Sequence, residues 1–163
     1  MGQLLIQLAV AEGAKITAVA AHGRPTEHMA ALGAEIALDI ETLAGDPFDI
    51  VLESVGGDVG SKAAYTLRPG GQYVWFGQAG GNPISLELFR LLQGGTSLIL
   101  RHFVYSDGDG SREAEDMAAL PALASHGKLQ VEIGHRGDFS SAGPLLKEMS
   151  TGRLRGKAVV SIG

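Results

Sequence analysis

Short apolar runs rich in β-branched residues alternate with helix-like runs along the whole 163-residue chain. The expected strands lie at residues 15–21, 35–38, 48–55, 72–77, 96–105, 131–133 and 157–162. The expected helices lie at residues 2–12, 27–32, 58–67, 85–93, 112–126 and 141–151. Strands that alternate with helices favour a parallel sheet with right-handed crossovers and helices on both faces. The sequence therefore predicts a single doubly wound α/β domain over residues 1–163.

Glycine marks the boundaries of these runs. The chain has 24 glycines among 163 residues, about 15%, against a norm of ~7%. Gly13 and Gly33 are placed to end helices, and Arg68–Gly71 is expected to be a turn. Thr26 and Ser111 are expected helix N-caps, and Pro121 is expected to kink or divide its helix.

Composition excludes several classes of function. The net charge of −5 argues against general binding to nucleic acid or to anionic lipid. No apolar run reaches the roughly 18–20 residues of a membrane span. The absence of cysteine excludes disulfides, thiolate zinc sites and a cysteine nucleophile, and the five scattered histidines have no metal-ligand spacing. For this reason we expect no metal site. Residues 1–10 contain no basic residue of a signal peptide, so we expect a cytoplasmic protein.

Three small loops that contain glycine follow expected strands, at residues 21–24, 54–57 and 77–81. In doubly wound sheets, ligands bind at the carboxyl ends of the strands. Glycine there lets backbone N–H groups approach a phosphate or a ribose, although tight turns also need glycine. We interpret the three loops together as a cofactor site. The usual fingerprint G-x-G-x-x-G is missing, and only Gly2 stands where its last glycine would be.

Several motifs occur in one order over nearly the whole chain. They are Gly2-x-x-x-x-Gln7-Leu8-Ala9, Leu32-Gly33-Ala34, the run from Phe48 to Gly57, Leu67-Arg68-Pro69-Gly70-Gly71, and Gly152-x-x-x-Gly156-Lys157-Ala158-Val159-Val160. Together they resemble the medium-chain dehydrogenase/reductase superfamily. The resemblance is closest to the zinc-independent quinone oxidoreductase-like members and their alcohol dehydrogenase relatives.

The resemblance implies that the chain is the Rossmann-like cofactor-binding part of such an enzyme. Family members carry a preceding catalytic domain, then a first strand and a glycine-rich turn that ends where Gly2 stands. None of these is in the sequence, so we expect the chain alone to be inactive and assign no catalytic residue. That strand is central in the parent sheet, so we expect its loss to destabilise the remainder, unless the gap is closed by rearrangement or by pairing with another chain. By the same resemblance, the segment from Val131 onward packs partly against the absent domain.

Ten residues are expected to bind the nicotinamide nucleotide. Gly2 is assigned to the pyrophosphate, and Arg24 to the 2′-phosphate with Ala21 and His22 beside it. Ser54, Val55, Gly56 and Gly77 are assigned to the ribose and nicotinamide, and Phe76 and Phe103 complete the set. No acidic residue stands about 20 residues after Gly2, where NAD enzymes bind the ribose 2′-hydroxyl. Arg24 is able to pair with a 2′-phosphate in bidentate fashion, which favours NADPH over NADH. Its alternative is a solvated arginine in a turn.

Two further features have two interpretations each. Glu53 lies near the nicotinamide ribose by resemblance, or is a carboxylate exposed to water at the edge of the core. Phe103 and Tyr105 either abut the nicotinamide or, the favoured interpretation, lie in the core or an interface. The long apolar strand Thr96 to Tyr105 would be an aggregation hazard if bare. By resemblance it pairs with its twin in a homodimer.

The function implied for the parent enzyme is NADPH-dependent reduction of a small carbonyl, quinone or enone. Hydride passes directly from the nicotinamide, while the protein supplies orientation and electrostatics. The alternative is a non-catalytic Rossmann-like domain for dimerisation or nucleotide sensing. A zinc alcohol dehydrogenase parent is a third possibility. The fold does not specify the substrate.

Overall fold

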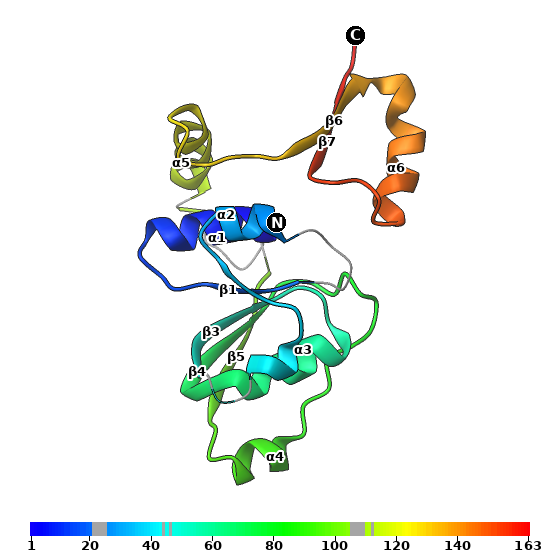
Figure 1. Cartoon of the computed structure of the whole chain (residues 1–163). Helices are drawn as coiled ribbons and strands as arrows, with labels where there is room; N and C mark the ends of the chain where they lie inside the picture. Colours follow the sequence, from blue (N-terminus) through cyan, green and yellow to red (C-terminus); the bar gives the residue numbers. More distant parts are fainter. Residues whose placement is uncertain (21–25, 44, 46, 105–109, 112) are drawn as a thin grey trace. The chain divides into compact units, whose positions relative to one another are not determined.

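The structure is a computed structural model that describes residues 1–20, 26–43, 45, 47–104, 110–111 and 113–163 (Figure 1). It divides into two compact units. One consists of Met1–Ala14 together with Glu113–Gly163, and the other of Lys15–Arg112.

The unit Lys15–Arg112 contains most of the predicted site. Its elements are β1 (Thr17–Val19), α2 (Glu27–Ala31), β2 (Glu35–Ala37), η1 (Ile40–Leu43), β3 (Phe48–Glu53), α3 (Gly57–Ala63), η2 (Ala64–Thr66), β4 (Leu67–Trp75), α4 (Leu88–Gln93) and β5 (Leu98–His102). The other unit contains α1 (Gly2–Ala11), α5 (Glu113–Ser125), β6 (Ile133–Asp138), η4 (Phe139–Ser141), α6 (Ala142–Ser150) and β7 (Lys157–Ser161).

All the strand pairs described are parallel, which confirms the predicted α/β class. The described strands form three separate sheets, β1-β2, β3-β4-β5 and β6-β7. Within the first unit, β1 and β3 are not hydrogen-bonded neighbours. The resemblance places a central strand at this point of the parent sheet, and no strand described here pairs with the free side of β1 or β3.

The core of the β3-β4-β5 sheet is built around Tyr73 of β4, whose side chain is completely buried. It packs with Ala63 of α3, Ala64 of η2 and Ile40 of η1. The Tyr73 hydroxyl donates a hydrogen bond to the carbonyl of Gly60, at 2.8 Å, and so fixes α3 against β4. This contact holds in place the helix that follows the predicted glycine loop 54–57.

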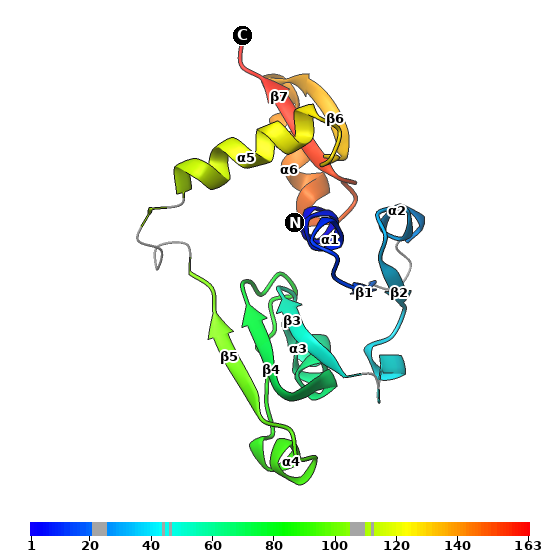
Figure 2. The same cartoon turned by 90° about the vertical axis from the view of Figure 1, so that its left-hand side faces the viewer.

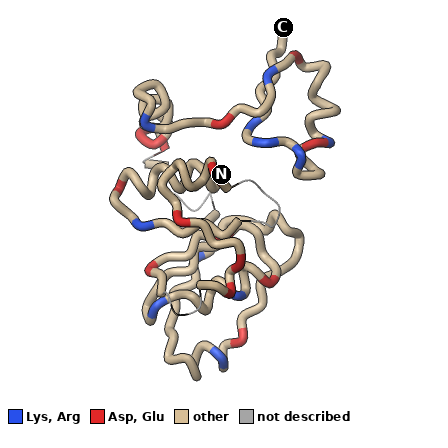
Figure 3. Tube along the Cα trace, viewed as in Figure 1, with Lys and Arg blue, Asp and Glu red and all other residues tan. Residues whose placement is uncertain are grey.

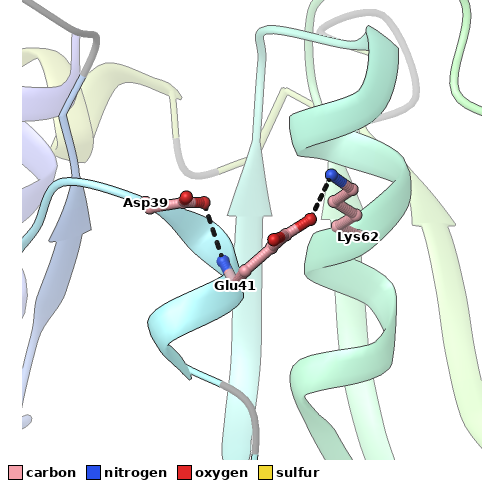
Figure 4. Close-up of polar contacts among 3 residues, drawn as sticks. All are labelled: Asp39, Glu41 and Lys62. Carbon is pink, nitrogen blue, oxygen red and sulfur yellow. Dashed lines mark hydrogen bonds and ion pairs between the residues drawn. The ribbon is translucent and has the colours of Figure 1, made fainter.

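A polar contact attaches η1 to α3 on the same unit (Figure 4). The Lys62 ammonium donates to Glu41 Oε1 at 2.6 Å, and the Glu41 backbone N–H donates to Asp39 Oδ1 at 2.9 Å. The hydrogen bond to Glu41 raises the pKa of Lys62 above its ordinary value. Because the Lys62–Glu41 pair is exposed, it contributes little to the free energy of unfolding. Its role is to orient η1.

In the other unit, α1 is joined to the segment before β6 by side-chain amides. Gln7 Nε2 donates to the Gln130 carbonyl at 2.9 Å, and the Gln130 N–H donates to Gln7 Oε1 at 2.6 Å. Gln3 Nε2 donates to Glu132 Oε2 at 2.8 Å, and Glu132 also pairs with Arg155. None of the helices described here has the length and apolar character to cross a membrane.

Several element boundaries differ from the sequence prediction. β4 includes the predicted turn 68–71, because a register shift between Phe48 and Ile50 accommodates these residues beside β3. α4 begins three residues later than predicted, and in the segment before it the N–H groups of Ser85 and Glu87 donate to the hydroxyls of Ser61 and Tyr65.

Four further predictions about these elements were wrong or only partly right. β5 spans five residues, shorter than the predicted 96–105, whose last residue lies outside the described part. β6 begins at Ile133 and runs on to Asp138 because pairing with β7, rather than apolar character, sets its length. α5 continues through Pro121, which removes one backbone donor without ending the helix. Thr26 occupies the N-cap position of α2 but makes no capping side-chain bond.

Candidate cofactor site

The carboxyl ends of β3, β4 and β5 form one edge of their sheet, as the parallel arrows in Figure 2 show. Glu53, Trp75 and His102 are the last residues of the three strands and lie opposite one another in register. The segments Ser54–Gly57 and Phe76–Asn82 follow β3 and β4 directly, and we call them the edge loops. This is the position at which doubly wound sheets bind ligands.

The two edge loops are joined to each other by backbone hydrogen bonds. Such bonds begin where β3 and β4 end and continue into the loops: Phe76 N–H to Glu53 O at 2.9 Å, Ala79 N–H to Ser54 O at 2.8 Å, Gly80 N–H to Val55 O at 2.8 Å, and Gly57 N–H to Asn82 O at 2.9 Å. Because each loop satisfies backbone groups of the other, the pair forms a single ordered platform.

Glycine is required where the loops approach each other. Gly56 has φ +80°, and a Cβ at this position would collide with the Asn82 carbonyl oxygen. A Cβ on Gly80 would lie 2.8 Å from the Val55 carbonyl oxygen. The glycines of this edge therefore allow the two backbones to meet, which is a more specific role than a tight turn alone.

Glu53 anchors the first edge loop from below. Its side chain is only 5% exposed, so the interpretation as a carboxylate open to water is wrong. Oε1 accepts two backbone hydrogen bonds, from Val55 N–H at 2.6 Å and from Gly56 N–H at 2.9 Å. Oε2 is buried and has no hydrogen-bond partner among the residues described.

Trp75 and His102 brace the second edge loop. Their rings stack with centroids 4.6 Å apart and planes at 25°. The indole N–H donates to the Gly77 carbonyl, and the Phe103 N–H donates to the Trp75 carbonyl at 2.8 Å. Phe103 is 61% exposed, so the expectation that it lies in the core is wrong and its ring is available to an interface or a ligand.

The edge loops contain no charged side chain, and they are tan in the charge-coloured trace of Figure 3. They offer backbone groups, the half-buried Ser54 hydroxyl and the Val55 side chain, which is 48% exposed. Such groups suit ribose hydroxyls, a carboxamide and an aromatic ring. A phosphate would need a cation from elsewhere in the chain.

The structure brings together six of the ten predicted site residues. Ser54, Val55, Gly56, Phe76 and Gly77 lie on the edge loops, and Phe103 directly follows β5. Gly2 begins α1 in the other compact unit. The remaining three, Ala21, His22 and Arg24, lie outside the described residues.

Two residues of this edge were missed by the sequence analysis. His102 stacks on Trp75, and the aligned ends of two adjacent strands are the signal that would have found it. Asn82 contacts the first edge loop through its backbone carbonyl, and a backbone contact leaves no signal in residue type.

The chain is similar to dehydrogenases and quinone oxidoreductases. A sequence model described as zinc-binding dehydrogenase matches residues 1–123. A putative alcohol dehydrogenase from Sinorhizobium meliloti is 27% identical, with a TM-score of 0.76 over 98% of this chain and 44% of that chain. The Coxiella burnetii quinone oxidoreductase is 26% identical, with a TM-score of 0.75 over 99% of this chain and 49% of that chain.

A third structure has a higher TM-score than these two and a lower sequence identity. The Escherichia coli quinone oxidoreductase complexed with NADPH is 22% identical, with a TM-score of 0.82 over 99% of this chain and 53% of that chain. The chain thus spans about half the length of the solved structures it matches. The comparison with curated proteins finds no match.

Proposed function

The chain belongs to the zinc-binding dehydrogenase family, and from this premise we propose that it is the nucleotide-binding part of an NADPH-dependent oxidoreductase. The observation that carries the proposal is the platform of two hydrogen-bonded glycine loops at the carboxyl edge of β3 and β4. The similarity to a quinone oxidoreductase complexed with NADPH supports it. The reaction class we propose is reduction of a small carbonyl, quinone or enone.

In this proposal the bound nicotinamide supplies the hydride, and the protein orients it. The edge loops receive the ribose and nicotinamide end, where Ser54 offers a hydroxyl and Val55 an apolar contact. Trp75 holds the Gly77 carbonyl, so the second loop keeps its shape when the nucleotide binds. Preformed loops reduce the ordering that binding would otherwise require.

The phosphates of the nucleotide are assigned to residues beyond the edge loops. We propose that Arg24 pairs with the 2′-phosphate, with His22 and Ala21 beside it, and that the N–H groups at Gly2 face the pyrophosphate. The absence of charge on the edge loops supports this division, because their groups suit the uncharged end of the nucleotide.

The described residues do not fit a zinc ion, although the family's description mentions zinc. The chain has no cysteine, and the described part contains no group of three histidine, aspartate or glutamate side chains that would hold a metal. We therefore derive no step through zinc. Because the chain spans about half of its relatives, we propose that substrate chemistry needs residues outside it.

We also propose a homodimer through the strand within Thr96–Tyr105. β5 is an edge strand of its sheet, and its apolar residues Ile99 and Leu100 are 49% and 52% exposed. Pairing with a second copy would cover this edge. The same exposed strand is the observation that favours the alternative function, a dimerisation module without chemistry.

Calorimetric titration of the full chain with NADPH tests the proposed function. We expect saturable binding that Val55→Glu weakens by about tenfold, roughly 1.4 kcal/mol, because it places a carboxylate beside the nucleotide. Val59→Glu is the matched control, since Val59 is similarly exposed but lies on α3 outside the loops. A folded chain that takes up no NADPH would refute the proposal, as would equal losses in the two variants.

A further inference from the structure

We propose that Glu53 is the positioning residue that shapes the first edge loop for the nicotinamide half of the nucleotide. The inference rests on the proposed function and deepens it. It assigns to the hydrogen bonds of the buried Glu53 carboxylate a part in nucleotide binding.

The Glu53 carboxylate fixes the backbone of the turn that follows it. A single oxygen, Oε1, accepts bonds from two successive backbone N–H groups, those of Val55 and Gly56. Charged acceptors make stronger hydrogen bonds than neutral ones. Both N–H groups are therefore directed inward, and the loop has little freedom to turn them toward solvent.

The surroundings of Glu53 are shaped to receive its side chain. α3 presents Gly60 to it, and a Cβ there would lie 3.0 Å from Glu53 Cδ, 3.1 Å from Oε2 and 2.8 Å from Cγ2 of Ile84. The Gly60 carbonyl in turn accepts the hydrogen bond from Tyr73 that fixes α3. The niche thus depends on a glycine in the helix and on a helix held at a set distance from β4.

The second oxygen makes a purely stabilising role a poor explanation. Oε2 is buried without a partner among the residues described, and burying an unpaired carboxylate oxygen is unfavourable. A residue retained for packing alone would not introduce this deficit. The two hydrogen bonds to Oε1 compensate for the unpaired Oε2, and they stabilise the loop rather than the core.

Because Glu53 fixes this backbone, the Val55 side chain is exposed. The carbonyls of Ser54 and Val55 are held by Ala79 and Gly80, and the N–H groups of Val55 and Gly56 by Glu53. With these backbone groups occupied, the Val55 side chain, 48% exposed, is the part of the turn that faces a ligand. Loss of Glu53 should therefore weaken contacts to the nicotinamide half and leave the adenosine half unaffected.

The experiment compares Glu53→Ala with Glu53→Gln in the full chain, using NADPH and 2′,5′-ADP as separate ligands in calorimetry. For Glu53→Ala we expect about tenfold weaker binding of NADPH and unchanged binding of 2′,5′-ADP, which lacks the nicotinamide half. Glu53→Gln keeps an oxygen at the Oε1 position and should restore most of the affinity. Equal losses for both ligands, or no loss for either, would overturn the inference.

Amide hydrogen exchange of Val55 and Gly56, measured without nucleotide, keeps the inference testable independently. We expect exchange at both amides to be faster in Glu53→Ala and close to the wild type in Glu53→Gln. If Glu53→Ala does not fold, Glu53→Asp replaces it, because a side chain one methylene shorter does not reach both amides. A wild-type chain without NADPH affinity refutes the proposed function, whereas unchanged exchange at both amides refutes the role of Glu53.

Discussion

The indole ring of Trp75 stacks on the imidazole of His102, with ring centroids 4.6 Å apart, at the carboxyl ends of β4 and β5. The same indole donates its N–H to the carbonyl of Gly77, the second residue of the loop that follows β4. The chain has one tryptophan. Its only indole therefore lies in direct contact with an edge loop, and its fluorescence reports on that loop.

The close approach of the edge loops is tested by replacing Gly56 with alanine. Gly56→Ala combines a left-handed φ with a collision against the Asn82 carbonyl, so we expect a loss of about 2–4 kcal/mol in unfolding free energy. Gly81→Ala is the matched control, because Gly81 has φ +77° but open space around its Cβ position. Urea unfolding followed by circular dichroism measures both, and equal losses would contradict the packing of the two loops.

Burial of Tyr73 predicts a weakness of the fold at alkaline pH. Burial, with a smaller contribution from Glu53, raises the pKa of Tyr73 above its ordinary value of 10.0. The folded state therefore retains a proton that the unfolded state releases, so the stabilisation is complete below pH 10 and is lost as the pH rises above it. Wild-type stability should decline more steeply above pH 10 than that of Tyr73→Phe.

Tyr73→Phe also has an expected effect at neutral pH. It removes the hydrogen bond from the buried Tyr73 hydroxyl to the Gly60 carbonyl, which costs about 1–3 kcal/mol. Urea midpoints of the two proteins at pH 7 and pH 11 decide the matter. Parallel decline of both proteins would show that another group causes the alkaline weakness.

Element types along the chain were readily predicted, because local patterns determine them. The apolar run of β3 and the glycines that follow it place Ser54, Val55 and Gly56 at a strand end from the sequence alone. The end of α1 near Gly13 is likewise a local feature, with φ +82° at that glycine.

Features that arise from contacts between distant segments were not predicted. The bulge that admits residues 68–71 into β4 and the bond from Gly57 to the Asn82 carbonyl both depend on tertiary neighbours. The division into three sheets has the same origin, because strand pairing requires a partner strand and not only β propensity. The role of Arg24 stays a prediction.

The nucleotide preference is tested at Arg24. If its guanidinium pairs with the 2′-phosphate, Arg24→Ala should weaken NADPH binding by about tenfold and leave NADH binding unchanged. Arg68→Ala serves as the control, because Arg68 pairs with Asp49 at the start of β3, far along the strand from the edge loops. A variant that loses affinity for both nucleotides equally would contradict the assignment.

The assembly proposal predicts a concentration-dependent dimer. Leu100→Lys places a charge on the exposed edge strand β5 and should convert the dimer to a monomer in sedimentation velocity experiments. Met117→Lys, an equally polar change at an exposed position of α5, should leave the dimer intact. A wild-type chain that is monomeric at all concentrations would contradict the proposal.

The central claim, that the nicotinamide end of NADPH binds at the edge loops, is tested most directly by energy transfer from Trp75. Excitation of the tryptophan in the full chain with NADPH should produce sensitised emission of the reduced nicotinamide, which saturates as binding sites fill. NADP⁺, which lacks that absorption band, and Trp75→Phe, which lacks the donor, should give none. Saturable binding by calorimetry without any energy transfer from Trp75 would place the nicotinamide elsewhere and contradict the account.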